Sequence, residues 1–454
     1  MRRWRGLASV GWGRKRRANE PLCWVWLAVV VGMLGTHPAT LRAQDGAQPG
    51  KPGATESRLE KIERENAELR SRVQALEEQR GADPAGADSR VADRGGEAEP
   101  SLRKDPHGIS IHSGPIAGIF QFFGDAGFEY DNPRPHDASS SSFVVGSFDL
   151  FTAVKIGERF NALAESVFEA DSAENKIGLE LERLWASWTM NDLLYVKLGR
   201  EHSPLSRWDR KLHHGRFLWL AATQPYLARF EEHDAILPIH AVGLELGGSA
   251  FSRLGTIEYV AGVFNGRGET PEDVQDVADR NNEKAVEVTL SFAPYFAAPL
   301  VTGASFYADE IPAIPGDLVR TRNVRELISM AFVDYERGPF QLLAEGGVIL
   351  HKDRDLDRHF DHHAGYVQAG YSIARVTPYV RFDWRSMAQG DSFFAPADRD
   401  LDRWEQLLGV QYRINEFAKV NVEGGLGRGQ QRHASGEVER RSLSRLTVSL
   451  SWAF

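Results

Sequence analysis

The carboxyl-terminal segment most constrains the fold of this chain. Its ten residues, RLTVSLSWAF, alternate apolar with small or polar side chains, which is the period of a β-strand. One face of that strand would carry Leu446, Val448, Leu450, Trp452 and Phe454. The other face would carry Arg445, Thr447, Ser449, Ser451 and Ala453. An apolar face exposed to water would be unfavourable. In a transmembrane β-barrel the apolar face of each strand meets lipid and the polar face meets the lumen, so the pattern predicts such a barrel.

A signal peptide is predicted at residues 1–43. A cluster of basic residues precedes about thirteen mostly apolar residues at 22–34, and cleavage is expected after Ala43. The apolar run is too short for a confident transmembrane anchor, since a helix needs about twenty residues to cross a bilayer. The only cysteine, Cys23, lies in this segment, so the mature chain would carry no thiol.

The composition agrees with a barrel. The mean hydropathy is −0.38 and 26% of the residues are charged, values that are typical of a soluble protein. A membrane barrel can have the same values, because only alternate residues of its strands meet lipid. Loss of the predicted signal peptide, which holds eight basic residues and one acidic residue, would take the formal charge from −9 to about −16. Nucleic acid is therefore not expected as a partner.

A short coiled coil is predicted at 57–79, after a flexible lead at 44–56. Its seam positions recur at spacings of three and four: Leu59, Ile62, Asn66, Leu69, Val73 and Leu76. A pattern of Arg, apolar, two residues, apolar, Glu occurs twice and resembles a trimer-favouring motif: Arg58, Leu59, Ile62, Glu63, then Arg72, Val73, Leu76, Glu77. A single solvated helix is the alternative. Because so short a coil is marginal alone, the barrels would have to support its trimerisation.

Residues 80–110 are small, polar and proline-rich, which predicts a flexible linker. Residues 111–454 then predict a sixteen-stranded antiparallel barrel, so the fold class is all-β. The expected strands start near Ile116, Phe143, Arg159, Lys176, Leu194, Ile239, Gly255, Glu283, Leu300, Val324, Phe340, His362, Thr377, Arg403, Ala418 and Leu443.

Short turns alternate with long polar loops between these strands. Turns are expected at 156–159, 190–193, 336–339, 373–376 and 414–417. In outer-membrane barrels the short side is periplasmic, and an even strand number places both ends of the barrel there, together with the coiled coil. A large soluble sandwich or barrel is the alternative. Aromatic residues near predicted strand ends favour membrane girdles instead: Trp185, Trp188, Trp384, Trp404, Tyr412 and Trp452.

Pore-lining residues are predicted from the longest connection, about 201–238, which is apolar enough to pack on an inner wall. Its cations include Arg207, Arg210, Lys211 and Arg216, and its acids are Glu231, Glu232 and Asp234. On lumen-facing strand positions, Lys197, Arg381, Asp383 and Arg385 complete the predicted selectivity set. Four loop cations within ten residues predict a preference for small anions.

Signal peptide, coiled coil, sixteen strands and a terminal Phe together resemble the trimeric phosphate-selective porins of bacterial outer membranes. The resemblance implies a homotrimer, a third loop that folds into the pore, and passive diffusion of small hydrophilic solutes. It also implies contact with outer-membrane lipid and lipopolysaccharide, and recognition of the last strand by the barrel-assembly machinery. Rows of like cations are less evident here than in that group, so phosphate specificity does not follow.

Three other functions remain open. An outer-membrane lipase or protease could use His202 with Ser203, or His213 and His214 with Asp209, but no GxSxG, HExxH or P-loop motif is present. A plugged transporter would need a folded domain before Ile116. The barrel could also be a structural anchor to the periplasm. We expect a porin with no enzyme activity, no cofactor and no bound metal. Two features nevertheless suggest cation binding. They are the histidines His351, His359, His362 and His363, and the hexapeptide DRDLDR, which occurs at 353–358 and 398–403.

Overall fold

A computed structural model describes residues 101–105, 108–132, 141–171, 176–213, 215–229, 235–316, 320–394, 400–432 and 437–454. The predicted signal peptide, lead and coiled coil lie outside these residues, as does most of the linker. Among the described residues, no helix is long and apolar enough to span a bilayer.

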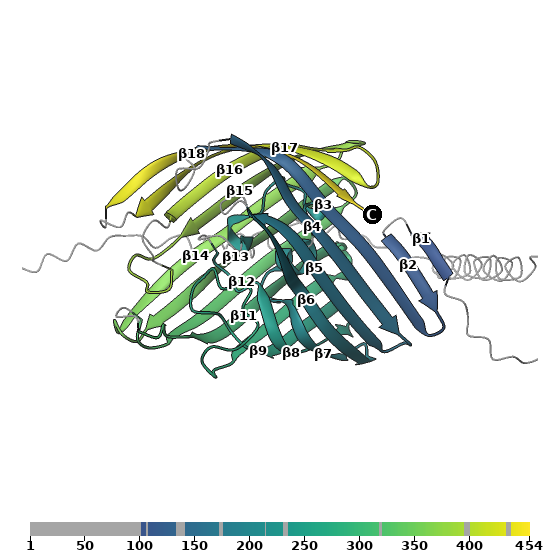
Figure 1. Ribbon diagram of the computed structural model, residues 1–454, viewed down its shortest axis with the longest axis horizontal. Helices are drawn as coiled ribbons and strands as arrows, with labels where there is room; N and C mark the ends of the chain where they lie inside the picture. Colours follow the sequence, from purple (N-terminus) through teal and green to yellow (C-terminus); the bar gives the residue numbers. More distant parts are fainter. Residues whose placement is uncertain are drawn as a thin grey trace, which may run out of the picture. The chain divides into compact units, whose positions relative to one another are not determined.

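Sixteen antiparallel strands form a closed barrel, which confirms the predicted fold class (Figure 1). Each strand pairs with the next, and the last pairs with the first, for example through Leu450 and Ala126. The strands are β3 (Ile116–Asn132), β4 (Ser141–Ile156), β5 (Phe160–Asp171), β6 (Lys176–Asn191), β7 (Leu194–His202), β8 (His240–Phe251), β9 (Gly255–Phe264), β10 (Ala285–Pro294), β11 (Leu300–Ile311), β12 (Val324–Arg337), β13 (Phe340–Asp353), β14 (Arg358–Tyr371), β15 (Val376–Ser386), β16 (Asp400–Arg413), β17 (Ala418–Arg432) and β18 (Val438–Ala453).

The final strand faces the two directions that its sequence predicts. Leu446 and Leu450 are 41% and 42% exposed on the outside, whereas Thr447 and Ser449 are each 1% exposed on the inside. The same alternation continues on β15, where Val380 is half-exposed and its neighbour Arg381 is buried. The outside of the barrel is therefore apolar and the inside polar, as a bilayer-spanning barrel requires.

Short turns join the strands at one end of the barrel, called here the turn end. Gly157 and Gly338 lie in two of these turns with φ of 61° and 58°, a left-handed conformation that glycine adopts without a steric penalty. Both ends of the barrel lie at the turn end, because Phe454 exchanges backbone hydrogen bonds with Phe122 near the start of β3.

A hairpin precedes the barrel where the sequence predicted linker. Strands β1 (Ser101–Asp105) and β2 (Gly108–Ser113) pair with each other, and β2 pairs with β3 over Ile116–Phe120. The hairpin uses the part of the β3 edge that lies beyond the C-terminus of β18 (Figure 1). The structure thus differs from the linker prediction at 101–105 and 108–110, since a backbone edge can order a segment that has no core of its own.

Most of the predicted aromatic girdle lies on the outside. Trp188, Trp404 and Tyr412 are 49%, 39% and 45% exposed there. Trp185 is an exception, because the ammonium of Lys197, an inward-facing residue, lies 4.8 Å from the centre of its ring. The prediction that Trp185 faces lipid was wrong, since an irregularity in the β5–β6 pairing between Glu165 and Ser166 shifts the alternation of β6.

Candidate functional site: a loop that crosses the barrel

Residues 203–239, named here the inner loop, connect β7 to β8, and the described parts of the loop, 203–213, 215–229 and 235–239, lie inside the barrel. The loop contains the helix α3 (Arg207–Leu212) and two single-turn 3₁₀ helices, η1 (Arg216–Leu218) and η2 (Tyr226–Ala228). It contacts inward-facing side chains of strands far apart around the ring: Asp125 on β3, Glu287 on β10, Glu345 on β13, Glu405 on β16 and Glu423 on β17. A segment with partners on all these strands must run through the lumen.

The start of α3 is held by the wall of the barrel. The backbone N–H groups of Arg207 and Trp208 donate to the carboxylate of Glu345, both at 2.7 Å. Ser206 caps the helix by accepting from the N–H of Asp209 at 3.2 Å. Glu345 thus satisfies N–H groups that the first turn of a helix leaves without intrahelical partners.

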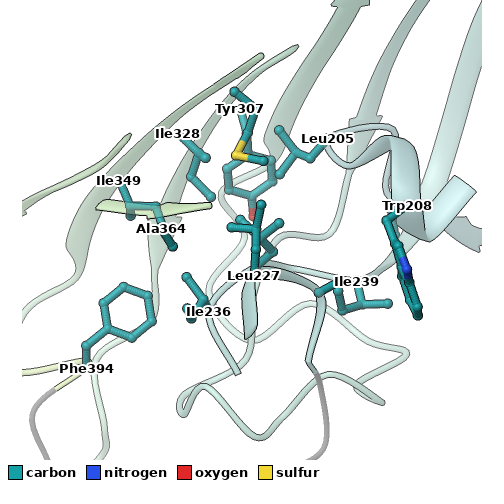
Figure 2. Packing of buried hydrophobic residues seen from close by; sticks show 14 of the residues in the cluster. Leu205, Trp208, Leu227, Ile236, Ile239, Tyr307, Ile328, Ile349, Ala364 and Phe394 are labelled. Atoms are coloured by element: carbon teal, nitrogen blue, oxygen red, sulfur yellow. The ribbon is translucent and has the colours of Figure 1, made fainter. Parts of the chain in front are cut away.

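Apolar side chains of the inner loop pack against the inner wall (Figure 2). Leu205, Leu227 and Ile236 are each 1% exposed, and the cluster includes Tyr307 from β11 and Ile328 from β12. Fully burying a Leu or Ile side chain contributes roughly 1.5–3 kcal/mol. The loop is therefore a packed part of the interior, as its apolar sequence predicts.

The second half of the loop is fastened by hydrogen bonds. The hydroxyl of Tyr226, which is completely buried, donates to Glu405. The backbone N–H of Ala222 donates to the hydroxyl of Tyr379 at 3.1 Å, and that hydroxyl donates to Glu423 at 3.0 Å. These tyrosine contacts were not predicted, although the alternation of β15 places Tyr379 on the same inward face as Arg381.

The four described loop cations of the predicted constriction all lie against wall carboxylates. Arg207 and Lys211 approach the carboxylate of Asp334 at 3.0 and 3.1 Å. Further pairs join Arg210 to Glu245 at 2.9 Å and Arg216 to Asp125 at 3.3 Å. The predicted acids Glu231, Glu232 and Asp234 lie outside the described residues, as does His214.

The predicted strand residues face the lumen, where they too have partners. Lys197 lies 2.9 Å from both Glu201 and Glu245. The guanidinium of Arg381 pairs with Asp383 at 2.9 Å and donates to Thr223 and Gln224 of the inner loop. Arg385 is 3% exposed, with its guanidinium 5.8 Å from the ring centre of Tyr226. Arg381 and Arg385 thus contact the inner loop, whereas Lys197 pairs with carboxylates of β7 and β8.

The serine of the alternative hydrolase set is engaged elsewhere. The hydroxyl of Ser203 donates to Glu287 at 3.0 Å, and the residue is completely buried. The imidazole Nδ1 of His213 lies 3.9 Å from Asp209. The geometry therefore gives Ser203 a structural role at the start of the loop and does not favour a nucleophile.

A second buried cluster fastens the connection after β15. Nδ1 and Nε2 of His351 lie 2.7 and 2.9 Å from carboxylate oxygens of Asp391 and Glu326, and Nε2 of His362 lies 3.1 Å from Asp391. Burial alone would raise the pKa of Asp391, but hydrogen bonds from these two histidines hold it well below its usual range. Phe393 and Phe394 follow, and both donate their backbone N–H groups to Asp391.

The first DRDLDR copy forms the tight turn between β13 and β14. Its Asp355 accepts hydrogen bonds from the N–H and hydroxyl of Thr321 at 2.7 and 2.8 Å, and Arg354 pairs with Glu310 at 2.6 Å. These contacts link neighbouring connections of the barrel. Residues 395–399, which include the first two residues of the second copy, lie outside the described residues.

The sequence matches no protein-family profile and no curated protein. Solved structures with a similar fold include an anion-selective porin from Comamonas acidovorans, at 12% identity and a TM-score of 0.53, covering 75% of this chain and all of that one. OmpF of Salmonella typhi, in complex with daunomycin, has 12% identity and a TM-score of 0.52, covering 76% and 100%. The outer-membrane channel DcaP of Acinetobacter baumannii has 10% identity and a TM-score of 0.50, covering 75% and 97%. At these identities the similarity establishes the barrel fold alone.

Proposed function

We propose that this protein is an outer-membrane porin through which small hydrophilic solutes diffuse passively. The observation that carries the proposal is the inner loop, which crosses a closed sixteen-stranded barrel and is fastened to inward-facing residues on several sides. Barrels of this size enclose more space than their own side chains fill, and a loop inside such a barrel narrows the passage. The solved porins of similar fold support the proposal.

Conductance tests this function directly. Purified, folded protein added to a planar lipid bilayer is expected to produce stepwise current increases, one for each inserted channel. The same preparation unfolded by heating serves as the control and should add none. Folded barrels that insert without any increase in current would contradict the porin proposal and favour an anchor or an enzyme. Recovery of the protein from the bilayer material verifies that insertion took place.

The charges inside the barrel bear on the ion preference of the proposed channel. The sequence predicts anion preference from four loop cations, but each of the four is paired with a carboxylate. Among the buried side chains of the described residues, seventeen Asp and Glu stand against eight Lys and Arg. We therefore propose that the loop cations position the loop and that the lumen favours small cations.

Reversal potentials in a salt gradient separate the two interpretations. We expect the wild-type channel to prefer cations, and the double variant Arg207→Gln/Lys211→Gln to prefer them more strongly, because Asp334 then loses both partners. Anion preference in the wild type that disappears in the double variant would instead support the interpretation from sequence.

Assembly and placement are proposed on the sequence and the fold together. We propose that the barrel lies in the bacterial outer membrane, that the turn end is periplasmic, and that 57–79 forms a trimeric coiled coil there. Chemical crosslinking of the purified protein should yield trimers. Removal of 57–79 should weaken trimerisation, because the seam from Leu59 to Leu76 would be lost.

A further inference from the structure

Four buried side chains converge where the inner loop leaves the wall. His202 ends β7 and His240 begins β8, and the two residues pair across the strands at the base of the loop. His213 follows α3 within the loop, and Glu182 projects inward from β6. Each of the four residues is at most 9% exposed, and one possible ligand atom from each lies within 4.8 Å of the others.

The arrangement has the dimensions of a tetrahedral metal site. Nε2 atoms of His240, His213 and His202 lie 2.5, 3.5 and 4.0 Å from Oε2 of Glu182. Ligand bonds of about 2.1 Å in a tetrahedron separate neighbouring ligand atoms by about 3.4 Å. The three distances from Oε2 of Glu182 are shorter or longer than this value by less than about 1 Å. Small side-chain rotations would therefore bring the three nitrogens and this oxygen to the corners of a tetrahedron.

An outer contact orients His240 as in metal proteins. Its Nδ1 lies 3.1 Å from the carbonyl oxygen of Val274. A hydrogen bond at the far nitrogen favours the tautomer whose Nε2 can bind a metal. Nδ1 of His213 faces Asp209 at 3.9 Å, which is longer than a hydrogen bond. The remaining oxygen of Glu182, Oε1, accepts from the side-chain amide of Gln275 at 3.2 Å.

The type, charge and number of the ligands indicate which metal would fit this site. Three neutral imidazoles and one carboxylate suit zinc and neighbouring divalent transition metals better than calcium or magnesium, which prefer oxygen ligands. Two buried carboxylates, Glu182 and Asp209, would balance the charge of one divalent ion. Four protein ligands complete a tetrahedron and leave no open position, which is typical of structural sites.

The cluster of His351, His362 and Asp391 also brings possible ligand atoms within 4.8 Å of one another, but it offers three ligands instead of four, and its nitrogens have other partners. Both ring nitrogens of His351 lie within hydrogen-bond distance of carboxylates on opposite sides, Asp391 and Glu326. Nδ1 of His362 accepts from the backbone N–H of Ala388 at 3.1 Å, and its Nε2 faces Asp391. With its nitrogens directed to separate partners, this cluster is a hydrogen-bonded network, and it provides a matched control.

We propose that Glu182, His202, His213 and His240 bind one divalent transition metal of the zinc class, which fastens the base of the inner loop to the barrel wall. This site departs from the sequence-based expectation of no metal. His202 and His213 were noticed only as possible partners of a catalytic serine, because the fold alone brings His240 and Glu182 beside them.

Metal titration of the full-length protein tests the proposal. The protein is purified without a polyhistidine tag, stripped with a chelator, exchanged into chelator-free detergent buffer, and titrated with Zn²⁺ by calorimetry. We expect one equivalent per chain. Co²⁺ should produce the intense visible absorption of tetrahedral coordination, and Zn²⁺ should displace it.

Two variants separate this site from the other cluster. His240→Gln is expected to weaken Zn²⁺ binding about 100-fold or more, since loss of an outer-shell contact alone typically costs 10- to 100-fold. His362→Gln, a matched change of a buried lumen histidine, should leave the affinity within a few-fold of wild type. Resistance of the folded barrel to unfolding in cold SDS verifies that each variant is folded.

Three results would overturn the proposal. They are a wild-type protein that takes up less than one equivalent, a folded His240→Gln that binds as tightly as wild type, and a Co²⁺ complex without tetrahedral absorption. If His240→Gln does not fold, Glu182→Gln replaces it, with an expected loss of at least about tenfold, and the wild-type Co²⁺ spectrum stands independently of either variant.

Discussion

At the scale of single residues, Arg381 shows how the wall and the inner loop depend on each other. Its guanidinium pairs with Asp383 and also donates to Thr223 and Gln224. Arg381 and Asp383 are 2% and 0% exposed. A buried pair adds little over a well-packed apolar pair, but one buried charge left alone is costly. The pair therefore matters most when only half of it is removed.

We predict that Arg381→Met destabilises the folded protein by about 3–5 kcal/mol, because Asp383 loses its partner. The double variant Arg381→Met/Asp383→Leu should recover much of that loss. Urea unfolding of the protein in detergent micelles measures both free energies. Equal stability of the single and double variants would show that the lost loop contacts, and not the lone carboxylate, dominate.

Asp391 gives a prediction about acid. A carboxyl with a depressed pKa contributes stability that is present above its unfolded pKa, about 3.9, and is lost as the pH falls toward the folded value. We expect the segment 387–394 to stay protected between pH 7 and about pH 4 and to become cleavable by an acid-active protease below that range. Asp391→Asn should make the segment cleavable at pH 7, because His351 and His362 lose their shared acceptor.

At the scale of elements, the strands were largely predictable because lipid and lumen impose strict alternation on them. The strand starts agree with prediction to within five residues, the largest difference being Val438 instead of Leu443 for β18. β14 begins at Arg358 rather than His362, since the polar DRDLDR segment makes a four-residue turn and not a long loop. Hydropathy could not distinguish these two forms, because both are solvated.

The hairpin β1–β2 and the partners of the inner loop were not predictable in the same way. β2 is ordered by the edge of β3, and no feature of GISIHS reveals where that edge ends. The inward-folding, wall-packed loop was expected from its apolar residues. Which carboxylate meets which cation, such as Asp334 with Lys211, depends on strands more than 100 residues away.

The packing of the inner loop sets the width of the passage in the proposed channel. We predict that Leu227→Ala loosens the loop and raises the mean conductance or its fluctuations, because Leu227 is 1% exposed and such truncations cost roughly 2–5 kcal/mol. Leu218→Ala, in the same loop but 39% exposed, is the matched control and should conduct like wild type. Identical single-channel recordings for both variants would exclude the loop as the narrowing element.

At the scale of the whole molecule, the inner and outer faces of the barrel differ in polarity. The inner face carries paired charges and the packed loop, whereas the outer face exposes large apolar side chains such as Leu408, Leu426 and Leu198, at 64–68%. Exposed apolar area of this extent on a monomer is typical of a membrane or protein interaction surface, and the proposed outer-membrane barrel would place lipid there. The sequence predicted this division from the last strand alone, because the alternation there is unbroken.

A matched pair of substitutions tests which solvent covers the outer face. Leu408 lies centrally in β16 and points outward, while Leu356, 45% exposed, lies in the turn between β13 and β14. Leu408→Arg is expected to destabilise the protein in lipid vesicles by about 2–4 kcal/mol, the cost of an arginine near the bilayer midplane. Leu356→Arg makes the same chemical change outside the bilayer and should cost little. Urea unfolding in vesicles provides both values, and equal values would mean that the centre of β16 does not face lipid.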